Sequence, residues 1–452
     1  RACTAINEEF NLEMAAGRID ALETEDALAI VAVIGSSMRH QVGVSGKMFS
    51  ALAANGINIK AIAQGSSERN ISVVIEARHL KKALNSLHED FFLSTIKRLH
   101  LFIIGTGNVG RAFLSQLHQQ ADKLYHAEGI DIKVAGLANS KKMIFAEEGI
   151  ALDNWQTRLA GGEAMQPATF IEKMFSLNLR NSIFIDNTAS EAIAHLYDQV
   201  LRHSIAVVTP NKIAASADYT VYKNLKQTAQ RYRTRFLFET NVGAGLPIIS
   251  TLNNLVQSGD EILAIEAVLS GSLNFIFNNY DGRRPFADVV RQARDKGYTE
   301  PDPRLDLSGL DVKRKLLILM REAGVACNIT DLQSESFLPP ACETAGSVND
   351  FLQALEEHEA HFQQLYATSA AAGKQLKYTA RYQNSDGLTG LQTIAPGHPF
   401  YDLQGKDNIV LFYTRRYPEQ PLLVRGAGAG AEVTASGIFA DVLLMAHAKP
   451  TC

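Results

Sequence analysis

The feature that most limits the possible folds is the glycine-rich segment "GTGNVG", which spans Gly105 to Gly110. It follows the apolar stretch Leu99–Ile104, which is typical of a buried strand, and it precedes a segment with apolar residues at helical spacing. In such a unit, Gly105 permits the tight turn, Gly107 lets a pyrophosphate approach the backbone, and Gly110 lets the helix pack closely on the strand. A glycine-rich turn can arise by chance, but this context favours a dinucleotide-binding site at the helix N-terminus.

Three further strand-like segments follow this turn, with helical patterns between them. Their sequences are "DIKVAGLAN", "NSIFIDNTAS" and "HSIAVVTPNK". Strands that alternate with helices form parallel sheets, because each crossover returns the chain to the same edge. We therefore predict a Rossmann-type, doubly wound parallel sheet over residues 97–236, with residues 425–452, a glycine-rich loop and a helix, packed back on it.

The remaining parts of the chain differ from this pattern, and 452 residues suffice for about three domains. Residues 1–96 have the pattern strand, helix, strand, strand, helix, which is the order of a ferredoxin-like unit. Residues 237–424 contain strands and helices without a regular alternation, so we predict a mixed α+β domain there.

The overall composition argues against several classes of protein. The formal net charge is −4 and no long run of lysine or arginine occurs, so nucleic acid is not an expected partner. No apolar run reaches the roughly 18–20 residues that span a bilayer, and the N-terminal segment, which lacks an initiating Met, has no apolar signal core. The scattered cysteines indicate a reducing, cytoplasmic-type compartment without a zinc site or a disulfide framework. They are Cys3, Cys327, Cys342 and Cys452.

The end of the second strand bears on the choice of nicotinamide cofactor. NAD sites usually place Asp or Glu there to hold the ribose hydroxyls, but this chain has "LANSKK", with Lys141 and Lys142. A lysine can pair with the 2′-phosphate of NADP, so the segment favours NADP slightly; solvent-facing lysines are nearly as good an interpretation, and NAD stays possible. Lys212, in "TPNK", follows the fourth strand at the ligand-binding edge of the sheet, where it could anchor a ligand oxygen or be a surface lysine.

A second glycine-rich segment, "ETNVGAGLP", runs from Glu239 to Pro247. The Glu239 carboxylate and main-chain carbonyls of the loop could bind a hard monovalent or divalent cation. Taken by itself, the segment fits a tight turn with an exposed glutamate better.

The segment "GYTEPDPRLDLSGLDVKRK", from Gly297 to Lys315, places many charges against the start of an apolar helix. Ser308 is the predicted N-cap of this helix, and Asp311 has the spacing of its capping-box partner. Asp311 and Lys315 are also four residues apart and therefore share a helix face. They could instead bind a small zwitterion and protonate an alkoxide.

These motifs carry a resemblance to a known family. "GTGNVG", "TPNK", "TNVGAGLP", "SGSLNFIF" and the long charged segment occur in the order seen in homoserine dehydrogenases. "GVSGKMFSALAANGINIKAIAQGSSERNISVVIE" resembles the ACT regulatory segment of bifunctional aspartokinase–homoserine dehydrogenase, whose C-terminal part the chain resembles from end to end. The resemblance implies that the parent chain also carries an aspartate kinase, and that residues 1–96 are part of an ACT region.

The resemblance further implies an activity and partners. The expected reaction is the reversible reduction of L-aspartate 4-semialdehyde to L-homoserine with NADPH or NADH, in the synthesis of threonine and methionine. A homodimer that pairs through the mixed-sheet domain is expected, as are a sodium ion and a possible threonine effector. The expected location is the cytoplasm, or a plastid stroma if the full-length chain carries a transit peptide.

Roles for individual residues follow from the same resemblance. Lys315 matches the proton donor, and Lys212 matches a lysine near the nicotinamide and substrate. The substrate-holding positions match Glu300, Asp306 and Asp311. Besides the glycines of the turn, the cofactor-contacting positions match Asn108, Val109, Thr188 and Gly297. The sodium site, built from one carboxylate and main-chain carbonyls, matches Glu239, Val242, Ala244 and Leu246, which favours a cation site over the exposed turn. An effector-binding glutamine matches Gln64, which could equally be a polar interface residue.

The implied chemistry suits these residues, although the chain departs from the family at two positions. A lysine is charged at neutral pH, so Lys315 can protonate the oxyanion that forms when hydride reaches the aldehyde carbon. Leu305 stands where relatives have an acid, and "DNTAS" replaces "CTSS" while keeping Thr188. The chain begins inside the ACT region, so threonine inhibition is expected to be impaired or absent. The alternative function is a non-catalytic sensor of an amino acid and a nucleotide.

Overall fold

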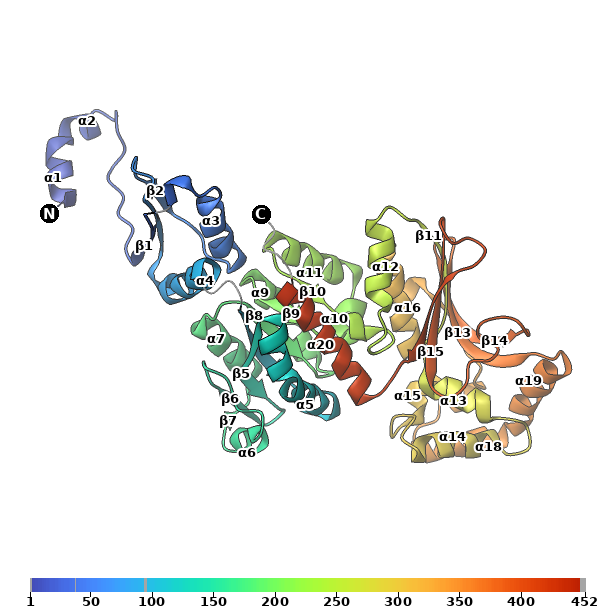
Figure 1. The fold of residues 1–452 in the computed structure, drawn as a ribbon. Coiled ribbons are helices and arrows are strands. Elements are labelled where there is room, and N and C mark those ends of the chain that lie inside the picture. Colours follow the sequence, from blue (N-terminus) through green and yellow to red (C-terminus); the bar gives the residue numbers. More distant parts are fainter. Residues whose placement is uncertain (1, 37, 93–95, 448–452) are drawn as a thin grey trace. The chain divides into compact units, whose positions relative to one another are not determined.

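The computed structural model describes residues 2–36, 38–92 and 96–447 (Figure 1). The chain divides into two compact units, Arg1–Ser94 and Thr95–Thr451. Within the described residues, Cys3 is an exposed free thiol, and Cys327 and Cys342 are buried free thiols. Cys452 and the rest of residues 448–452 from the predicted C-terminal segment lie outside the described residues, as do residues 1, 37 and 93–95 of the predicted N-terminal unit.

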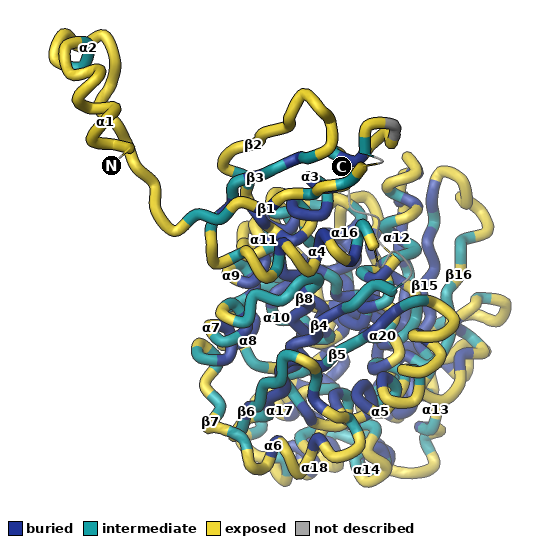
Figure 2. The backbone as a smooth tube through the Cα atoms, turned by 60° about the vertical axis from the view of Figure 1, so that its left-hand side comes forward, coloured by how far each residue is buried: buried dark blue, intermediate teal, exposed yellow. Residues whose placement is uncertain are grey.

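The first unit is a three-stranded antiparallel sheet with two helices on one face. Its elements are α1 (Ala2–Glu9), α2 (Asn11–Ala15), β1 (Leu28–Ile34), α3 (Val44–Ala54), β2 (Ala61–Gln64), β3 (Asn70–Glu76) and α4 (Leu80–Phe92), with short 3-10 turns at Met38–His40 and Ala77–His79. The order β–α–β–β–α is the predicted one, and the strands lie in the order β1–β3–β2. Alternate residues of β3, including Val73, are buried against the helices because side chains alternate across a strand. No residue of α1 or α2 is buried, as Figure 2 shows.

The second unit begins with a seven-stranded sheet in the order β10–β9–β8–β4–β5–β6–β7. Its strands are β4 (Lys97–Ile104), β5 (Ile130–Ala138), β6 (Lys142–Phe145), β7 (Glu163–Ala164), β8 (Ser182–Asp186), β9 (Ala206–Val208) and β10 (Phe236–Leu237). Its helical elements are α5 (Asn108–Lys123), a π-helical turn (Leu124–Glu128), α6 (Trp155–Ala160), α7 (Pro167–Leu177), α8 (Glu191–Ala194), α9 (Tyr197–Arg202), α10 (Lys212–Ser216) and α11 (Tyr219–Arg231). The four predicted strands are parallel and adjacent, which confirms the Rossmann-type sheet. The antiparallel edge pair β6–β7 was not predicted, because strands of four and two residues carry little pattern.

The rest of this unit is a mixed sheet with helices, as predicted. The sheet order is β12–β14–β13–β11–β15–β16, antiparallel except for the β12–β14 pair. The strands are β11 (Ile262–Val268), β12 (Gln333–Glu335), β13 (Gln375–Gln383), β14 (Asp386–Ile394), β15 (Asp407–Thr414) and β16 (Leu422–Ala427). The helices are α12 (Ile248–Gln257), α13 (Gly271–Asn279), α14 (Phe286–Asp295), α15 (Pro303–Leu307), α16 (Leu310–Glu322), α17 (Pro340–Glu343), α18 (Val348–Glu357) and α19 (Glu359–Ala371), with 3-10 turns at Glu239–Asn241 and Ile329–Asp331.

The last helix, α20 (Ala431–His447), packs on α5, one of the helices that accompany the seven-stranded sheet (Figure 1). Phe439 meets Phe113 edge-on with ring centroids 6.4 Å apart, and Ile438 is fully buried. The Gln116 side chain of α5 donates to the Glu432 carbonyl at 3.0 Å. The helix therefore packs back on the part of the chain that forms the seven-stranded sheet, although the whole mixed-sheet segment lies between it and β10 in the sequence. The three domain boundaries stay predictions.

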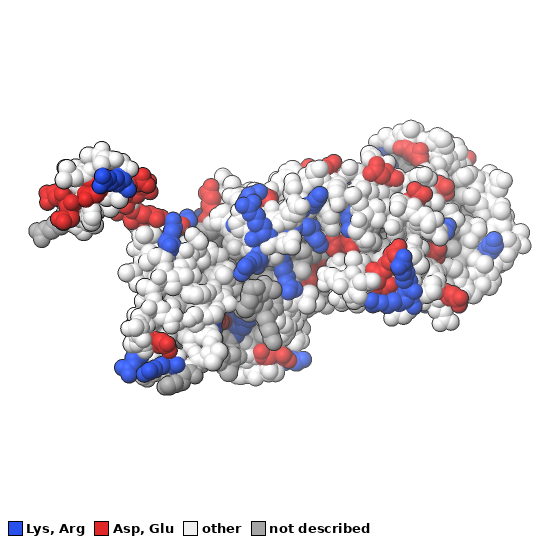
Figure 3. All heavy atoms as spheres, turned by 90° about the horizontal axis from the view of Figure 1, so that it is seen from above, with Lys and Arg blue, Asp and Glu red and all other residues white. Residues whose placement is uncertain are grey.

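Two surface properties complete this description. No helix in the described part of the chain is long and apolar enough to cross a membrane. On the face drawn in Figure 3, basic and acidic side chains form small separate groups among uncharged atoms.

Candidate active site

The glycine turn between β4 and α5 has the geometry that its sequence predicts. Gly105 has a φ of 101°, and a Cβ there would lie 2.8 Å from the carbonyl carbon of Asn187. A Cβ on Gly110 would lie 2.0 Å from the Gly105 carbonyl oxygen, so helix and strand approach too closely for any side chain. A Cβ on Gly107 would meet nothing within 4 Å. Open space beside the turn thus coincides with the position expected for a pyrophosphate.

The surroundings of the turn fit a polar ligand. Asn108 and Val109 begin α5, where the first backbone N–H groups of a helix have no partner within the helix. The side-chain nitrogen and oxygen of Asn187 are both buried and have no hydrogen-bond partner. Thr188 lies beside Gly105, with its methyl group 3.1 Å from where a Cβ on that glycine would be. Buried polar atoms without partners call for a bound polar group or an ordered water, so the residues present suit a dinucleotide.

A buried network behind the turn fixes two loops, and sequence reasoning missed it. Asp186, at the end of β8, accepts hydrogen bonds from the Thr188 N–H at 2.8 Å, the Tyr197 hydroxyl at 2.6 Å and the Asn211 amide at 3.0 Å. Asn211 also caps α10, because its side-chain oxygen accepts from the Ile213 N–H at 3.1 Å. Burial raises the pKa of Asp186 although these donors oppose it. An acid at the carboxyl end of a parallel strand was the signal that could have revealed this residue.

Lys212 directly follows the Asn211 cap. With two residues of α16 it forms a cluster of three charged side chains. The Asp311 carboxylate lies 3.3 Å from the Lys212 ammonium and 2.8 Å from the Lys315 ammonium. Lys315 also donates to the Leu269 carbonyl at 2.7 Å. The structure therefore brings together three predicted site residues that are up to 103 positions apart in the sequence.

The electrostatics of this cluster are strongly coupled. Burial acts to raise the pKa of Asp311, but the ammonium groups of Lys315 and Lys212 outweigh it and hold that pKa well below its usual range. Burial lowers the pKa of Lys212, and nearby Lys315 adds to the effect while Asp311 opposes it. The Asp311 side chain nevertheless keeps 49% of its surface exposed, and that of Lys315 keeps 10%. The cluster is therefore within reach of a small ligand while protein surrounds most of it.

The start of α16 differs from the predicted capping box. Gly309, with a φ of 70°, is the N-cap, and no side chain caps the helix. A Cβ on Gly309 would lie 2.0 Å from the Tyr378 hydroxyl, so close packing selects glycine here. The Ser308 hydroxyl donates to the Leu305 carbonyl at 2.8 Å and accepts from the Leu310 N–H at 3.3 Å. The prediction that Ser308 caps the helix is wrong, because α16 begins at Leu310 and its N-cap is Gly309. Asp311 is not a capping-box partner, because its carboxylate contacts the two lysines.

Asp306 holds the loop that carries Glu300. Its carboxylate accepts from the Ser272 hydroxyl at 2.6 Å and from the Glu300 N–H at 2.9 Å, and burial raises its pKa. Glu300 itself is exposed, as is Gly297, whose φ of 68° ends α14. Leu305, where relatives have an acid, is 62% exposed. Asp306 thus supports the loop that carries Glu300. Sequence reasoning missed Ser272, which donates a hydrogen bond to Asp306.

The segment predicted to bind sodium is built around the N-terminus of α12. The two oxygens of Glu239 accept from the Ile249 and Ser250 N–H groups, each at 2.7 Å, and burial raises the pKa of this carboxyl group. Glu239 is half-buried, so the interpretation as an exposed glutamate is wrong. Ala244, at a φ of 53°, and Val242 are buried, and Leu246 is half-buried. No group of three or more His, Cys, Asp or Glu that could hold a metal occurs among the described residues. A site with one carboxylate is of a different kind and stays a prediction.

A second buried carboxylate lies beside Glu239. Asp441 of α20, 3% exposed, accepts from the Glu239 N–H at 3.2 Å. Burial and the negative charge of Glu239 raise the pKa of Asp441 to about 8. Sequence reasoning missed this residue because nothing in α20 indicates that it reaches Glu239.

The pKa of Asp441 predicts a pH-dependent stability. An acid that binds its proton more tightly when folded makes the free energy of unfolding fall as pH rises from about 4, where the unfolded carboxyl titrates, towards 8. We expect Asp441→Asn to flatten this decline, measured by chemical denaturation at several pH values in a buffer of organic cations. Glu432→Gln, an exposed change on the same helix, is the control. A decline as steep in Asp441→Asn as in the parent protein would contradict the assignment.

Gln64, the predicted effector residue, belongs to the first unit. It is the last residue of β2, it is exposed, and it lies opposite Ile71 of β3. Its role as an effector-binding residue stays a prediction.

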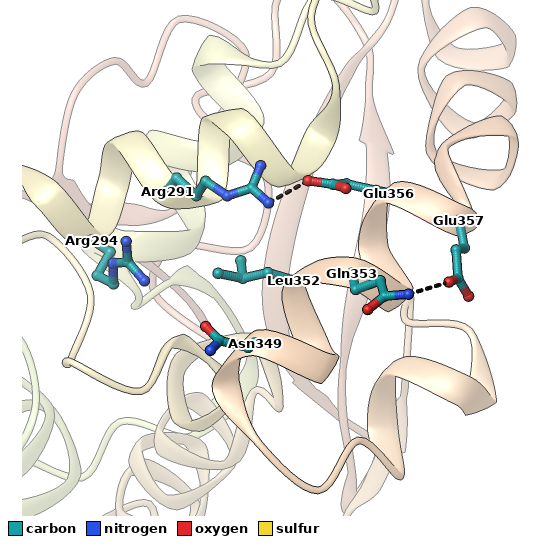
Figure 4. A pocket seen from close by; sticks show the side chains of 7 residues that line it. All are labelled: Arg291, Arg294, Asn349, Leu352, Gln353, Glu356 and Glu357. Carbon is teal, nitrogen blue, oxygen red and sulfur yellow. Dashed lines mark hydrogen bonds and ion pairs between the residues drawn. The ribbon is translucent and has the colours of Figure 1, made fainter.

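A separate hollow of about 590 Å³ lies between α14 and α18 (Figure 4). Among its lining residues, Arg291 forms an ion pair with Glu356, and Gln353 donates to Glu357 at 2.9 Å. It contains none of the predicted site residues. The charge cluster of Lys212, Asp311 and Lys315 is therefore the better candidate for chemistry.

Models of three protein families match the chain. The NAD binding domain of homoserine dehydrogenase matches residues 105–239, and the homoserine dehydrogenase model matches residues 247–443. An ACT domain model matches residues 31–91. The NAD binding domain match thus contains the glycine turn and Lys212. The homoserine dehydrogenase match contains the other two members of the charge cluster, and the ACT match contains Gln64.

Individual proteins are similar over most of the chain. The chloroplastic bifunctional aspartokinase/homoserine dehydrogenase 2 of Zea mays is 41% identical over 445 residues, which cover 98% of this chain and 48% of the relative. The homoserine dehydrogenase of Schizosaccharomyces pombe is 35% identical over 76% of this chain and 94% of its own. A crystal structure of a Candida auris protein of unknown function superposes with a TM-score of 0.71 at 35% identity, covering 77% of this chain and 98% of that one. The chain therefore spans about half the length of the bifunctional relative and nearly all of the S. pombe enzyme.

Proposed function

Since this chain belongs to the homoserine dehydrogenase family, we propose that it catalyses the reversible reduction of L-aspartate 4-semialdehyde to L-homoserine with a nicotinamide cofactor. The observation that carries the proposal is the cluster of Lys212, Asp311 and Lys315. Asp311 holds two ammonium groups within 3.3 Å, one of them from the nucleotide-binding part of the chain. In this proposal Lys315 is the proton donor, and its partner Asp311 also contacts Lys212 of the nucleotide-binding part.

The residues of the chain have separate tasks in this proposal. The N–H groups at the start of α5 and the open space beside Gly107 would hold the pyrophosphate, and Thr188 would line the site next to it. The cofactor, when bound, supplies or accepts the hydride. Lys315 donates a proton to the substrate oxygen as negative charge develops there, and the Leu269 carbonyl orients its ammonium group. Glu300 and Asp311 would attract the ammonium group of the amino-acid substrate.

Several finer assignments are part of the proposal. Glu239 with the carbonyl groups of Val242, Ala244 and Leu246 would bind a sodium ion. The ACT unit would bind threonine near Gln64, and the active form would be a homodimer. A location in the cytoplasm or a plastid stroma fits the chloroplastic name of the maize relative. The comparisons offer no support for a non-catalytic sensor.

The test of the proposal is a rate measurement. The absorbance of reduced nicotinamide is followed with L-aspartate 4-semialdehyde as substrate, with NADPH and NADH in parallel and with threonine added. We expect turnover that depends on the semialdehyde. A folded protein that binds NADPH but shows no turnover would contradict the proposed activity.

Cofactor choice gives a specific prediction at Lys141. Its neighbour Lys142 donates to the Gly162 carbonyl at 2.9 Å, whereas the exposed Lys141 contributes its backbone N–H to Asn139 and leaves its ammonium group towards solvent. We expect Lys141→Ala to raise KM for NADPH about tenfold, the equivalent of one charge-assisted hydrogen bond, without affecting NADH. Steady-state kinetics with both cofactors measure this. Lys123→Ala, at the far end of α5, is the control, and equal effects on both cofactors would contradict the role of Lys141.

A further inference from the structure

The last turn of α16 carries a buried arginine that the proposed reaction does not use. Arg321 is 4% exposed. Its guanidinium donates to the carbonyls of Ala215 at 2.8 Å, Ala217 at 2.7 Å and Cys327 at 3.0 Å. All of these acceptors are neutral, so the arginine is not there to form an ion pair. Its planar fork instead joins α16 to the end of α10.

The helix α10 is only five residues long and is held at both ends. Its first end is capped by Asn211, whose amide is bound to the buried Asp186. Its last end presents carbonyl groups that have no partner further along the helix, and Arg321 binds two of them. Lys212 is the first residue of this helix. The position of the Lys212 ammonium along α16 therefore depends on where Arg321 fixes the other end.

The same two helices meet again at the charge cluster. Asp311 and Arg321 are ten residues apart on α16, a rise of about 15 Å. Asp311 contacts the first residue of α10, and Arg321 contacts its last carbonyls, so α10 lies alongside α16 with a polar link at each end. Of the two ion pairs in the cluster, Lys212–Asp311 has the longer distance between nitrogen and oxygen, 3.3 Å. A small shift of α10 would break it first.

A neighbouring contact offers an internal comparison. Glu322, next to Arg321, accepts a hydrogen bond from the Tyr222 hydroxyl and pairs with the Lys226 ammonium at 3.0 Å, which ties α16 to α11. The Arg321 guanidinium also lies over the rings of Tyr219 and Tyr222, 5.7 and 5.1 Å from their centroids. The Glu322 contact joins the same two parts of the protein as Arg321 does, but it does not touch α10.

We propose that Arg321 is a positioning residue, which fixes α10 against α16 and so holds the Lys212 ammonium beside Asp311. The inference rests on the proposed function only for the consequence in turnover, because the placement of Lys212 can be measured without it. Lysine at position 321 keeps the charge but is a compact point donor that cannot span two carbonyls of α10 and one of Cys327. Arg321→Lys is therefore the informative variant, and Arg321→Met is the more severe one.

The direct readout is the reactivity of Lys212. Competitive acetylation over a pH series, read by mass spectrometry, reports the titration of this lysine, which Asp311, Lys315 and Arg314 face. In Arg321→Lys we expect the apparent pKa of Lys212, measured in this way, to differ from its value in the parent protein. We also expect kcat/KM for the semialdehyde to fall about ten- to a hundredfold, as for a displacement near 1 Å, with the dissociation constant of NADPH changed less than about threefold.

The control is Lys226→Met, which removes the ion pair with Glu322 and leaves α10 untouched. We expect it to lower the melting temperature without moving the Lys212 titration. If Arg321→Lys lowers only the melting temperature, as the control does, Arg321 is merely structural and the proposal is overturned. If the parent protein lacks semialdehyde turnover, the proposed activity fails, while the acetylation series still decides the role of Arg321. Should Arg321→Met fail to fold, Arg321→Lys alone carries the test.

Discussion

Replacing Lys315 by methionine is expected to lower kcat for semialdehyde reduction by about 10²–10⁴-fold, the usual contribution of a general acid. The Lys315 ammonium is the buried member of the cluster, 2.8 Å from Asp311 and 2.7 Å from the Leu269 carbonyl. Methionine keeps the length and packing of the side chain and removes the proton. Rates at saturating substrate and cofactor measure the effect, and fluorescence titration with NADPH shows whether the cofactor still binds.

The matched control is Lys313→Met on the same helix. Lys313 is half-exposed and is not a member of the cluster. We therefore expect the kcat of Lys313→Met to stay within about twofold of the parent value. A Lys315→Met variant that binds NADPH and turns over at the parent rate would remove Lys315 as the proton donor.

Replacing Asp311 by asparagine is expected to have the next largest effect. Without the carboxylate, the Lys212 and Lys315 ammonium groups repel each other, and the group that raises the pKa of Lys212 is gone. We expect kcat/KM for the semialdehyde to fall about a hundredfold, equivalent to one or two charge-assisted hydrogen bonds of roughly 1.5–3 kcal/mol each. The pKa of Lys212 should fall further. Since a charged Lys212 is expected to anchor a ligand oxygen, the alkaline limb of the rate–pH profile should move to lower pH.

The control for this variant is Asp288→Asn, on the surface of α14. Asp288 is paired with Arg291 at 2.8 Å and lies outside the cluster. We expect no change in its rate–pH profile. An unchanged alkaline limb in Asp311→Asn would mean that Asp311 does not govern the charge of Lys212.

Local patterns predicted much of the fold. The apolar run before Gly105, the spacing of apolar residues after it and the strands that follow are short-range signals, and the parallel sheet agrees with them. The β6–β7 edge pair and the helices α1 and α2 were missed, because very short strands and helices without a buried residue show little apolar periodicity. Ser308 was misassigned because a serine shortly before a helix is a good cap by itself, whereas α16 begins one residue later than predicted, with Gly309 as its N-cap.

The candidate site divides in the same way. Gly105 and Gly110 could be assigned from the sequence, since a tight strand–helix turn needs glycine wherever it occurs. Asp311 and Lys315 could be placed on one face of a helix, because they are four residues apart. Whether Asp311 capped its helix or held charges could not be decided from the sequence, because its second partner, Lys212, is 99 positions away.

By itself, then, the sequence determined the elements that form through neighbouring residues: the glycine turn, the strand and helix order and the helical pair Asp311–Lys315. The tertiary structure decided which charged side chains contact each other and which backbone groups they bind. It brought Lys212 to Asp311, turned Glu239 to the N–H groups of α12 and placed Asp441 beside it. The reason is physical. Helix and turn geometry depend on a few adjacent residues, whereas the charge and pKa of a buried group depend on every element packed against it.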